Sequence, residues 1–218
     1  NSSSVASSLN SGVKEIFHTD GAFAALKSDG SVVTWGGSSQ YFGGDSSSVA
    51  SSINSGVIEI FSTQRAFAAL KSDGSVITWG GLNGQVFGNN SSSVANSINS
   101  GVIDISSNQR AFAALKSDGS VITWGDSFYG GNSSSVASSI NSGVIKIFPG
   151  ARGAFAALKS NGSLVTWGNS DYGGDSSSVS SDLSSGVTQV FSAHGPSGRA
   201  SFAALKGGSE VVSWGNYI

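Results

Sequence analysis

The feature that most constrains the fold is an internal repeat that runs through the 218-residue chain. A hexapeptide, Ala-Phe-Ala-Ala-Leu-Lys, recurs almost unchanged, and a Trp-Gly pair follows each copy about 45 residues after the previous one. The hexapeptide copies begin at Ala22, Ala66, Ala111, Ala154 and Ser201. A fixed period in this range indicates a solenoid, a propeller or an array, and the segments within one copy must decide between them.

Each copy contains four strand-sized segments, which in the second copy are residues 57–61, 66–71, 76–79 and 93–98. None of the four carries a helical period long enough to build a helix. The apolar run at 66–70 does not alternate with polar residues, and this predicts a strand buried on both faces. The fourth segment is mostly serine, as expected of an outer strand that faces solvent.

Tight turns join these segments. Ser-Asp-Gly-Ser at 72–75 and Asn-Ser-Gly at 99–101 place a glycine where a hairpin turn needs a positive φ. Four short strands joined by tight turns are typical of one propeller blade. The fold class that we predict is therefore all-β: a five-bladed β-propeller of four-stranded antiparallel blades, forming a single domain over residues 1–218.

The two ends of the chain carry different segment types. The fourth type opens the chain at 4–9, and the third type closes it at 211–214. We therefore expect the N-terminal strand to complete the last blade and close the ring, which would remove two open sheet edges.

Residues 102–125 resemble the repeat of the regulator of chromosome condensation family: an apolar strand, a strand ending in Ala-Leu, Asp-Gly, a short strand and Trp-Gly. The second copy continues with Asn-Gly-Gln-Val-Phe-Gly at 83–88, which is similar to the family's Asn-x-x-Gly-Gln-Leu-Gly tail. The resemblance covers all five copies and implies propeller blades of four antiparallel strands.

The chain also departs from that family. It has five compact repeats where the family usually has seven longer ones, and the family's histidine before the Ala-Leu strand is missing from every copy. Aromatic residues at 41–43 and 128–130 replace the Gln-Leu-Gly tail. Family members include a nucleotide exchange factor for a small GTPase, but the surface residues of that activity find no match here, so it is not carried over.

Comparison of the copies separates two uniform turns from two sets of variable loops. The first set joins segments one and two, at 18–21, 62–65, 106–110, 149–153 and 192–199. The second set follows Trp-Gly, at 37–45, 81–90, 126–132, 169–175 and 216–218. Because strand direction alternates, both sets are predicted to lie at one end of the blades, with the uniform turns at the other. Variable loops on a rigid scaffold often bind partners, although drift alone also makes loops vary.

The candidate binding residues are polar, charged and aromatic side chains of these loops. In the first set they are His18, Asp20, Gln64, Arg65, Gln109, Arg110, Arg152, His194 and Arg199. In the second set they are Tyr41, Asp45, Phe87, Asn90, Tyr129, Asn132, Tyr172 and Asp175. An aromatic ring beside Asp or Asn is the combination that a sugar site needs, and the alternative is that each ring fills the blade edge.

Two further residue types recur once per copy. The tryptophans are predicted to be structural, because a buried aromatic residue anchors blade packing; they are Trp35, Trp79, Trp124, Trp167 and Trp214. The lysines either surround a central channel and hold an anion or extend to solvent from strand ends; they are Lys27, Lys71, Lys116, Lys159 and Lys206.

Composition argues against several classes of function. A net charge of -2 with 11% charged residues is unlike a nucleic-acid-binding surface. No apolar run reaches the length of a membrane span, and no cysteine is present for disulfide or thiolate chemistry. The two histidines lack metal-ligand spacing, and no nucleophile motif occurs. We therefore predict no enzymatic activity, no metal and no cofactor, while the compartment stays open.

Three functions stay open. The first is a non-enzymatic interaction module that binds a protein partner through the variable loop face, which the differences between loops favour. The second is a multivalent carbohydrate-binding lectin with one site per blade, which the near-identity of the copies favours. The third is a structural repeat segment of a larger surface protein or an engineered repeat protein.

Overall fold

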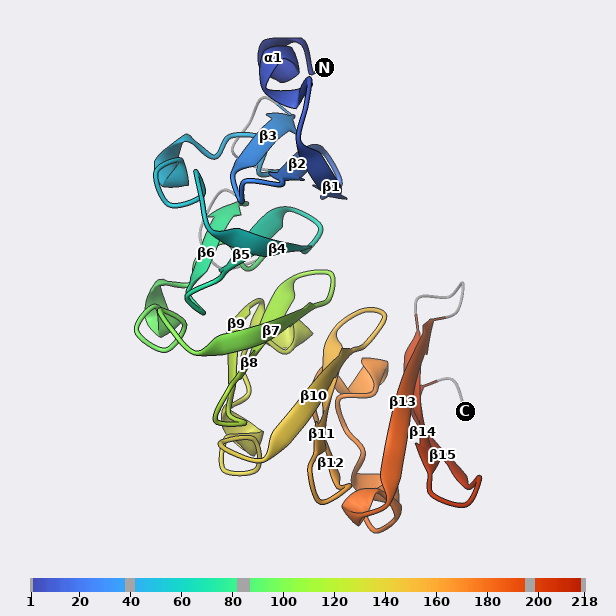
Figure 1. Cartoon of the computed structure of the whole chain (residues 1–218). Helices are drawn as coiled ribbons and strands as arrows, with labels where there is room; N and C mark the ends of the chain where they lie inside the picture. The colour runs from blue at the N-terminus through green and yellow to red at the C-terminus, as the bar shows by residue number, and fades with distance from the viewer. Residues whose placement is uncertain (1, 38–41, 82–86, 195–198, 217–218) are drawn as a thin grey trace. The chain divides into compact units, whose positions relative to one another are not determined.

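The computed structural model describes residues 2–37, 42–81, 87–194 and 199–216. In these residues fifteen strands form five three-stranded antiparallel sheets that follow one another along the chain (Figure 1). The first sheet contains β1 (Val13–His18), β2 (Ala22–Lys27) and β3 (Val32–Gly36); the second β4 (Val57–Ser62), β5 (Ala66–Lys71) and β6 (Val76–Gly80); the third β7 (Val102–Ser107), β8 (Ala111–Lys116) and β9 (Val121–Gly125); the fourth β10 (Val144–Pro149), β11 (Ala154–Lys159) and β12 (Leu164–Gly168); the fifth β13 (Val187–His194), β14 (Ala200–Lys206) and β15 (Val211–Gly215). The all-β class and the five repeats are confirmed.

The chain divides into two compact units, Asn1–Ile103 and Asp104–Ile218, with the boundary inside β7. Each is described by itself below. The single domain over residues 1–218 stays a prediction.

The central strand of each sheet is the most deeply buried element. In the second sheet Ala66, Phe67, Ala68, Ala69 and Leu70 are all buried, as the unbroken apolar run predicted. Alanine leaves room for a neighbouring sheet to approach closely, while phenylalanine on the opposite face fills the space between sheets. The central strands are therefore the core of the molecule.

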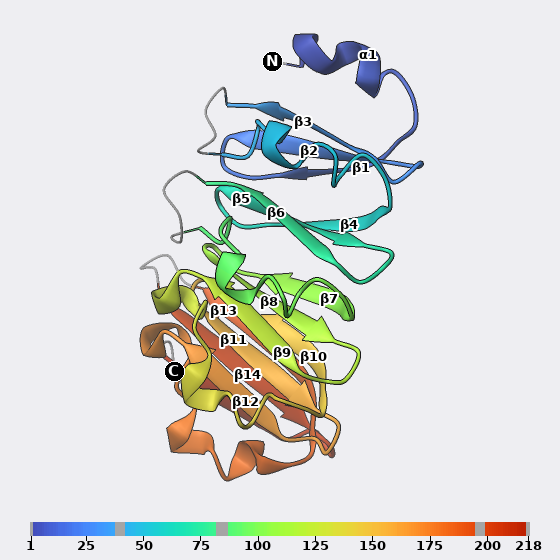
Figure 2. The ribbon, with the colours of Figure 1, turned by 90° about the vertical axis from the view of Figure 1, so that its left-hand side faces the viewer.

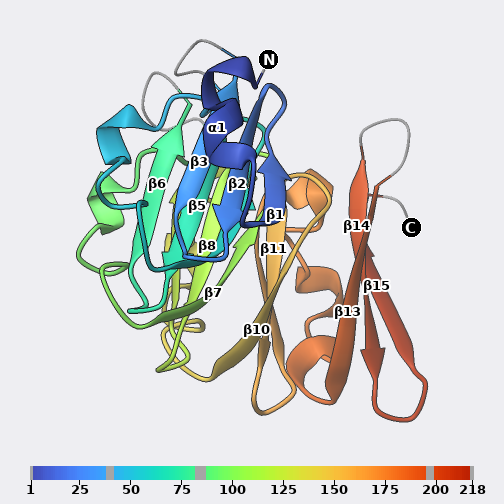
Figure 3. The same cartoon turned by 45° about the horizontal axis from the view of Figure 1, so that its top comes forward.

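Neighbouring sheets within a unit pack through one recurring apolar junction. In the first unit Ala24 and Leu26 of the first sheet meet Ile60 and Phe67 of the second, with Ile53 between them. The second unit repeats this arrangement between its third and fourth sheets and between its fourth and fifth. The fifth sheet, β13 to β15, is drawn in red in Figure 3. One sheet cannot bury both of its faces alone, so each repeat depends on its neighbour.

The predicted fourth strand is wrong, because this segment forms helical turns. They are the 3-10 turns η1 (Ser3–Val5), η2 (Ser47–Val49), η3 (Ser92–Val94), η5 (Ser134–Val136) and η7 (Ser177–Val179), with the α-helical turn α1 (Ala6–Leu9) after η1. Further 3-10 turns are η4 (Ser127–Tyr129), η6 (Ser170–Tyr172) and η8 (Asp182–Ser184). Among the helices of the described residues, none is long and apolar enough to cross a membrane.

The segment between the first and second sheets gives the physical reason for this correction. Asp45 Oδ1 accepts a hydrogen bond from the backbone of Ser47 at 2.9 Å, which forms a side-chain turn that leads into η2. Ile53 N then donates to Val49 O at 3.2 Å, so Val49 and Ile53 lie on one side of a helical turn. Blades of four strands are therefore replaced by three strands and a helical turn.

The N-terminal segment is also helical and not a strand. Its turns η1 and α1 precede β1 and appear as a coiled ribbon in Figure 2. The expected N-terminal strand is therefore also wrong. Closure of the five sheets into a ring stays a prediction.

Candidate interaction surface at the variable-loop end

The two sets of variable loops meet at one end of each sheet, as the alternation of strand direction predicts. We call this the variable-loop end. A buried side chain of the first set donates a 2.7 Å hydrogen bond to a backbone carbonyl of the second set in three sheets. These bonds run from Thr19 Oγ1 to Phe42 O, from Thr63 Oγ1 to Phe87 O and from Asn108 Nδ2 to Tyr129 O.

The uniform turns lie together at the opposite end. Ser72 N donates to Gly56 O at 2.9 Å, which joins the Ser-Asp-Gly-Ser turn of the second sheet to the Asn-Ser-Gly turn before it. Val57 N donates to Gly30 O at 3.0 Å and links the turns of neighbouring sheets. Backbone N–H and carbonyl groups at this end thus bind one another.

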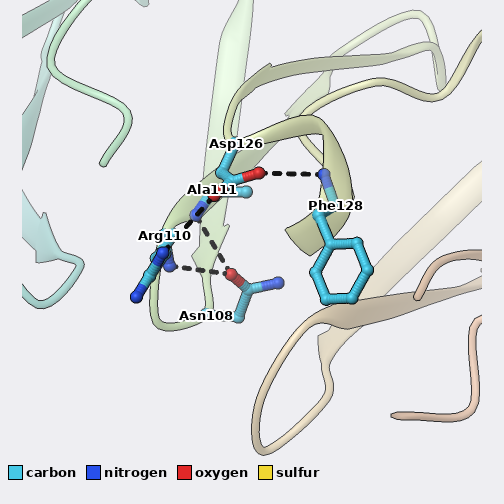
Figure 4. Close-up of polar contacts among 5 residues, drawn as sticks. All are labelled: Asn108, Arg110, Ala111, Asp126 and Phe128. Atoms are coloured by element: carbon cyan, nitrogen blue, oxygen red, sulfur yellow. Dashed lines mark hydrogen bonds and ion pairs between the residues drawn. The ribbon is translucent and has the colours of Figure 1, made fainter. Parts of the chain in front are cut away.

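The hairpin of the third sheet shows how loop residues are fixed in position (Figure 4). Asn108 Oδ1 accepts hydrogen bonds from Arg110 N and Ala111 N at 3.1 and 3.0 Å. Asp126 N donates to Arg110 O at 3.1 Å, and Asp126 Oδ1 accepts from Phe128 N at 2.9 Å, which caps η4. Arg110 also lies 3.7 Å from the Asp126 carboxylate. Asn108 and Asp126 therefore set the backbone that presents Arg110 and Phe128.

Arginine side chains lie over the aromatic rings of the second loop set. The Arg65 guanidinium is 5.3 Å from the Phe42 ring centroid and 4.6 Å from that of Phe87. The Arg110 guanidinium is 4.8 Å from the Tyr129 ring. Such cation–π contacts are favourable and cover one face of each ring. The half-buried rings of Phe42, Tyr129 and Tyr172 also pack against the apolar core.

An aromatic cluster joins the loops of the third and fourth sheets within the second unit. Phe128 is 59% exposed and stands edge-on to Tyr129 and Tyr172, with ring centroids 5.8 and 6.5 Å away. Tyr129 and Tyr172 are themselves 6.5 Å apart. Gly153 packs directly beside these rings. A larger residue would not fit there, since a Cβ atom would lie 2.9 Å from Tyr172 Cδ2. Phe128 is therefore an exposed ring held on a packed base.

Candidate residues with carboxyl or amide groups in the second loop set form side-chain turns just before the 3-10 turns. Asp45, Asn90, Asn132 and Asp175 each accept a 2.9 Å hydrogen bond from the backbone two residues later. Hydrogen bonds from Ser47 hold the pKa of Asp45 below its usual value, and Ser177 does the same for the pKa of Asp175. These oxygens already have backbone donors, which weakens their fit to a sugar site.

The remaining candidates lie in the first loop set, apart from Tyr41, which falls outside the described residues. His18, Asp20 and His194 are exposed, while Gln64 and Gln109 are half-buried. Asp20 N donates to Gln64 O at 2.8 Å, so the backbones of consecutive loops touch in the first unit. Gln109 N donates to Arg152 O at 3.4 Å in the second. His194 is the last residue of β13, which extends further than the sequence predicted.

The repeated tryptophans and lysines make contacts within the scaffold. Trp79, Trp167 and Trp214 are buried, and each Nε1 donates to a glycine carbonyl after the previous sheet, at Gly43, Gly130 and Gly173. The Nζ atoms of Lys27, Lys71 and Lys159 donate to the carbonyls of Ser8, Ser52 and Ser139. Lys206 pairs with Glu210 at 3.4 Å. These contacts favour local roles over an anion site made by a lysine ring.

Several residues that shape this surface were not among the sequence candidates. Thr19, Thr63 and Asn108 occupy equivalent loop positions, and a small polar residue at a loop start is a recognisable turn signal. Asp126 precedes η4 as a capping residue does. Phe128 belongs to the aromatic residues noted at 128–130, but comparison of the copies does not single it out, because the equivalent residue in the next copy is Asp171. In the described part of the chain, no three His, Asp or Glu side chains gather as a metal site would require.

The sequence matches no protein-family model and no curated protein sequence. Solved structures do resemble the chain. Human WBSCR16 is 18% identical with a TM-score of 0.53, over 93% of this chain and 61% of that one. Prp20p from Saccharomyces cerevisiae is 16% identical with a TM-score of 0.56, over 92% and 56%. The same yeast protein, RCC1 (Prp20), in a structure with Kap60 is 17% identical with a TM-score of 0.52, over 93% and 56%.

The chain thus spans a little over half the length of these similar structures. The likeness, at low identity, shows the fold alone. It is the β-propeller repeat fold of the RCC1 type, as the resemblance of the repeat implied.

Proposed function

We propose that the chain is a non-enzymatic interaction module that binds a protein partner through its variable-loop end. The observation that carries this proposal is the exposed Phe128 on its packed base of tyrosines, with arginines in the adjoining loops. Exposed aromatic and arginine side chains on a rigid support are the residues that dominate binding energy at protein interfaces. The uniform-turn end offers mainly serine, glycine and asparagine.

The similar structures support a scaffold of this kind without supplying a partner. Prp20p is described by its binding of Gsp1p and histones, and its second structure holds Kap60. Function belongs to the residues placed on a fold, so these partners are not transferred to this chain. The absence of a catalytic role, of a cofactor and of nucleic acid as a partner belongs to the same proposal.

The lectin alternative fits the second loop set less well. Arginines already cover one face of the Phe87 and Tyr129 rings, and the nearby Asn90 and Asn132 oxygens accept hydrogen bonds from their own backbone. A sugar would need both the ring faces and the polar groups. A glycan array tests this alternative directly, and binding there would replace the protein-binding proposal.

A selection experiment tests where binding occurs. Peptides selected from a displayed random library against the folded chain are measured on two composite variants by biolayer interferometry. The loop variant changes the loops at 62–65, 106–110 and 192–199 to the sequence of 18–21. The turn variant carries Asp29→Asn, Asp73→Asn and Asp118→Asn at the opposite end. Circular dichroism melts confirm that both variants fold.

We expect the loop variant to lose most of the selected binders and the turn variant to keep them. Loss in the turn variant with the loop variant unaffected would place the site at the wrong end and reject the proposal. If selection yields no binders at all, the third function, a structural repeat segment, becomes the better interpretation.

A further inference from the structure

We infer that the partner presents an acidic segment, whose carboxylates bind Arg152 and Arg199 while an apolar side chain packs on Phe128. This inference rests on the proposed function and adds the chemistry of the partner. It concerns only the variable-loop end of the second unit.

The two arginines hold a position different from that of Arg65 and Arg110. In each sheet the residue after Trp-Gly donates its N–H to the carbonyl of the residue that comes just before the hexapeptide. The acceptors are Gly21, Arg65, Arg110, Gly153 and Ala200. Arg152 and Arg199 each come one residue before this acceptor, where the second and third sheets have Gln64 and Gln109. The fourth and fifth sheets therefore carry their arginine outside the position that stacks on the rings.

These guanidinium groups lack a counter-ion within the described residues. Arg110 lies near Asp126, but Arg152 and Arg199 have no carboxylate within 4.0 Å there. Arg152 Nε is buried with no hydrogen-bond partner. The nearby Asp171 carboxylate already accepts a 2.9 Å hydrogen bond from Asn216 Nδ2. A buried donor without a partner is rare in folded proteins and needs an explanation, and a carboxylate of a bound partner is the explanation that we propose.

The two arginine loops begin next to one another. Ser192 Oγ donates to Pro149 O at 3.1 Å, which ties the end of β10 to β13 just before the loops start. Gly153, the neighbour of Arg152, lies against the rings of Tyr129 and Tyr172, and both rings contact Phe128. The loop of Arg152 therefore adjoins the base of the exposed ring, and β13, which precedes the loop of Arg199, lies beside the end of β10.

A carboxylate suits this surface for geometric reasons. The planar guanidinium donates two parallel hydrogen bonds to a carboxylate, and such charge-assisted bonds are the strong ones. Phosphate offers similar oxygens, but the aromatic base and Phe128 require an apolar side chain beside the anion. A protein segment that alternates acidic and aliphatic residues supplies both.

Fluorescence anisotropy with defined peptides tests the inference. The probe is a short fluorescein-labelled peptide that alternates Glu-Leu with Gly-Ser, and the matched probe replaces each Glu by Gln. The test variant is Arg152→Gln with Arg199→Gln. The charge control is Lys14→Gln with Lys146→Gln, which removes the same charge from the exposed first strands β1 and β10.

We expect the Glu probe to bind the wild-type chain and the test variant to bind it about tenfold more weakly. The charge control should stay within about twofold, because exposed charges at a distance are screened by salt. Equal binding by the test variant, or equal binding of the Gln probe, would overturn the inference. A short thymidine oligonucleotide that binds more tightly than the Glu probe would do so in favour of phosphate.

The failure of this inference is distinguishable from failure of the proposed function. If library binders are lost in the loop variant but do not depend on Arg152 and Arg199, the variable-loop end still binds a protein and only the acidic partner is wrong. If the turn variant loses the binders while the loop variant keeps them, both ideas fail together.

Discussion

Single side-chain oxygens that bind their own backbone decide much of the local structure. Asp29 Oδ1 accepts hydrogen bonds from Ser31 Oγ at 2.7 Å and Ser31 N at 2.9 Å, and the turns at Asp73 and Asp118 repeat this. Asn161 makes the same turn with Ser163 in the fourth sheet. An asparagine can therefore make the same turn as these aspartates, but without their negative charge.

These turns predict a dependence of stability on acid. The hydroxyl of the following serine, and then its N–H, hold the pKa of Asp29, Asp73 and Asp118 below the usual value of 3.8. A carboxyl whose pKa is depressed in the folded state adds stability above its unfolded pKa and loses it as pH falls through the folded pKa. The melting temperature should therefore decrease as the pH is lowered below about 4. The variant Asp29→Asn, Asp73→Asn, Asp118→Asn should show a shallower fall, and an unchanged slope would contradict the assignment.

A second prediction at this scale concerns Trp167. Its ring stacks on Phe155 at 5.4 Å and its Nε1 donates to Gly130 O at 3.0 Å. Trp167→Ala removes both contacts and should lower the free energy of unfolding by about 3–5 kcal/mol. Trp167→Phe keeps a stacked ring and should lower it by less. Urea unfolding measures both, and a loss below about 1 kcal/mol in Trp167→Ala would argue against a structural tryptophan.

At the scale of elements, the sequence predicts the sheets better than the segments between them. The apolar run of β5 and the glycine turns each allow one conformation, so both were predicted correctly. The serine-rich segment was ambiguous, because Val49 and Ile53 share a face in a strand and in a helical turn alike. Asp45 and its equivalents were the signal that favours the turn, because Asp and Asn side chains often bind their own backbone two residues on.

A bulge in the first strand of the sheet was not predicted. The register shifts between Val57 and Glu59, and again between Val144 and Lys146, which leaves Ile58 and Ile145 exposed. Nothing in an alternation of apolar residues marks where one residue is skipped. The stacking of Arg65 on two rings was equally out of reach, because it depends on how neighbouring sheets pack.

Two isoleucines between η5 and β10 or within β10 test whether the helical segment is part of the core. Ile140 follows η5 and is 1% exposed, while Ile145 lies at the bulge and is 56% exposed. Ile140→Ala should lower the free energy of unfolding by about 2–4 kcal/mol, since a buried isoleucine leaves a cavity. Ile145→Ala should change it by less than about 0.5 kcal/mol. Similar values for the two in chemical denaturation would mean that the segment is peripheral.

At the scale of the whole molecule, the first and last sheets differ from the others in exposure. Val211, which begins β15, is 65% exposed, whereas its equivalents Val76, Val121 and Leu164 are each 7% exposed. Ile16 and Phe23 of the first sheet are also exposed, although their counterparts in later sheets are buried. The same positions form junctions between neighbouring sheets elsewhere in the repeat. We propose that those of the first and last sheets pack together and close the ring.

Internal junctions show which atoms would meet. Val32 N donates to Ile53 O at 2.9 Å, and Val121 N donates to Ile140 O at 3.0 Å. A disulfide needs two Cα atoms about 4.4–6.8 Å apart, so residues that share a backbone hydrogen bond are candidates for one. The equivalent pair at the ends of the chain is Val211 and Leu9. Because the chain contains no cysteine, a disulfide introduced there has no competing thiols.

Closure of five repeats into one ring is the central claim about the whole molecule, and a disulfide trap measures it most directly. The variant Leu9→Cys with Val211→Cys is oxidised at low concentration, beside Val32→Cys with Ile53→Cys as the control for a junction within the first unit. Mass spectrometry and size-exclusion chromatography then follow the products. We predict that both variants form an intramolecular disulfide in a monomer at similar rates. Free thiols, or a disulfide found only in dimers, for Leu9→Cys with Val211→Cys would contradict closure.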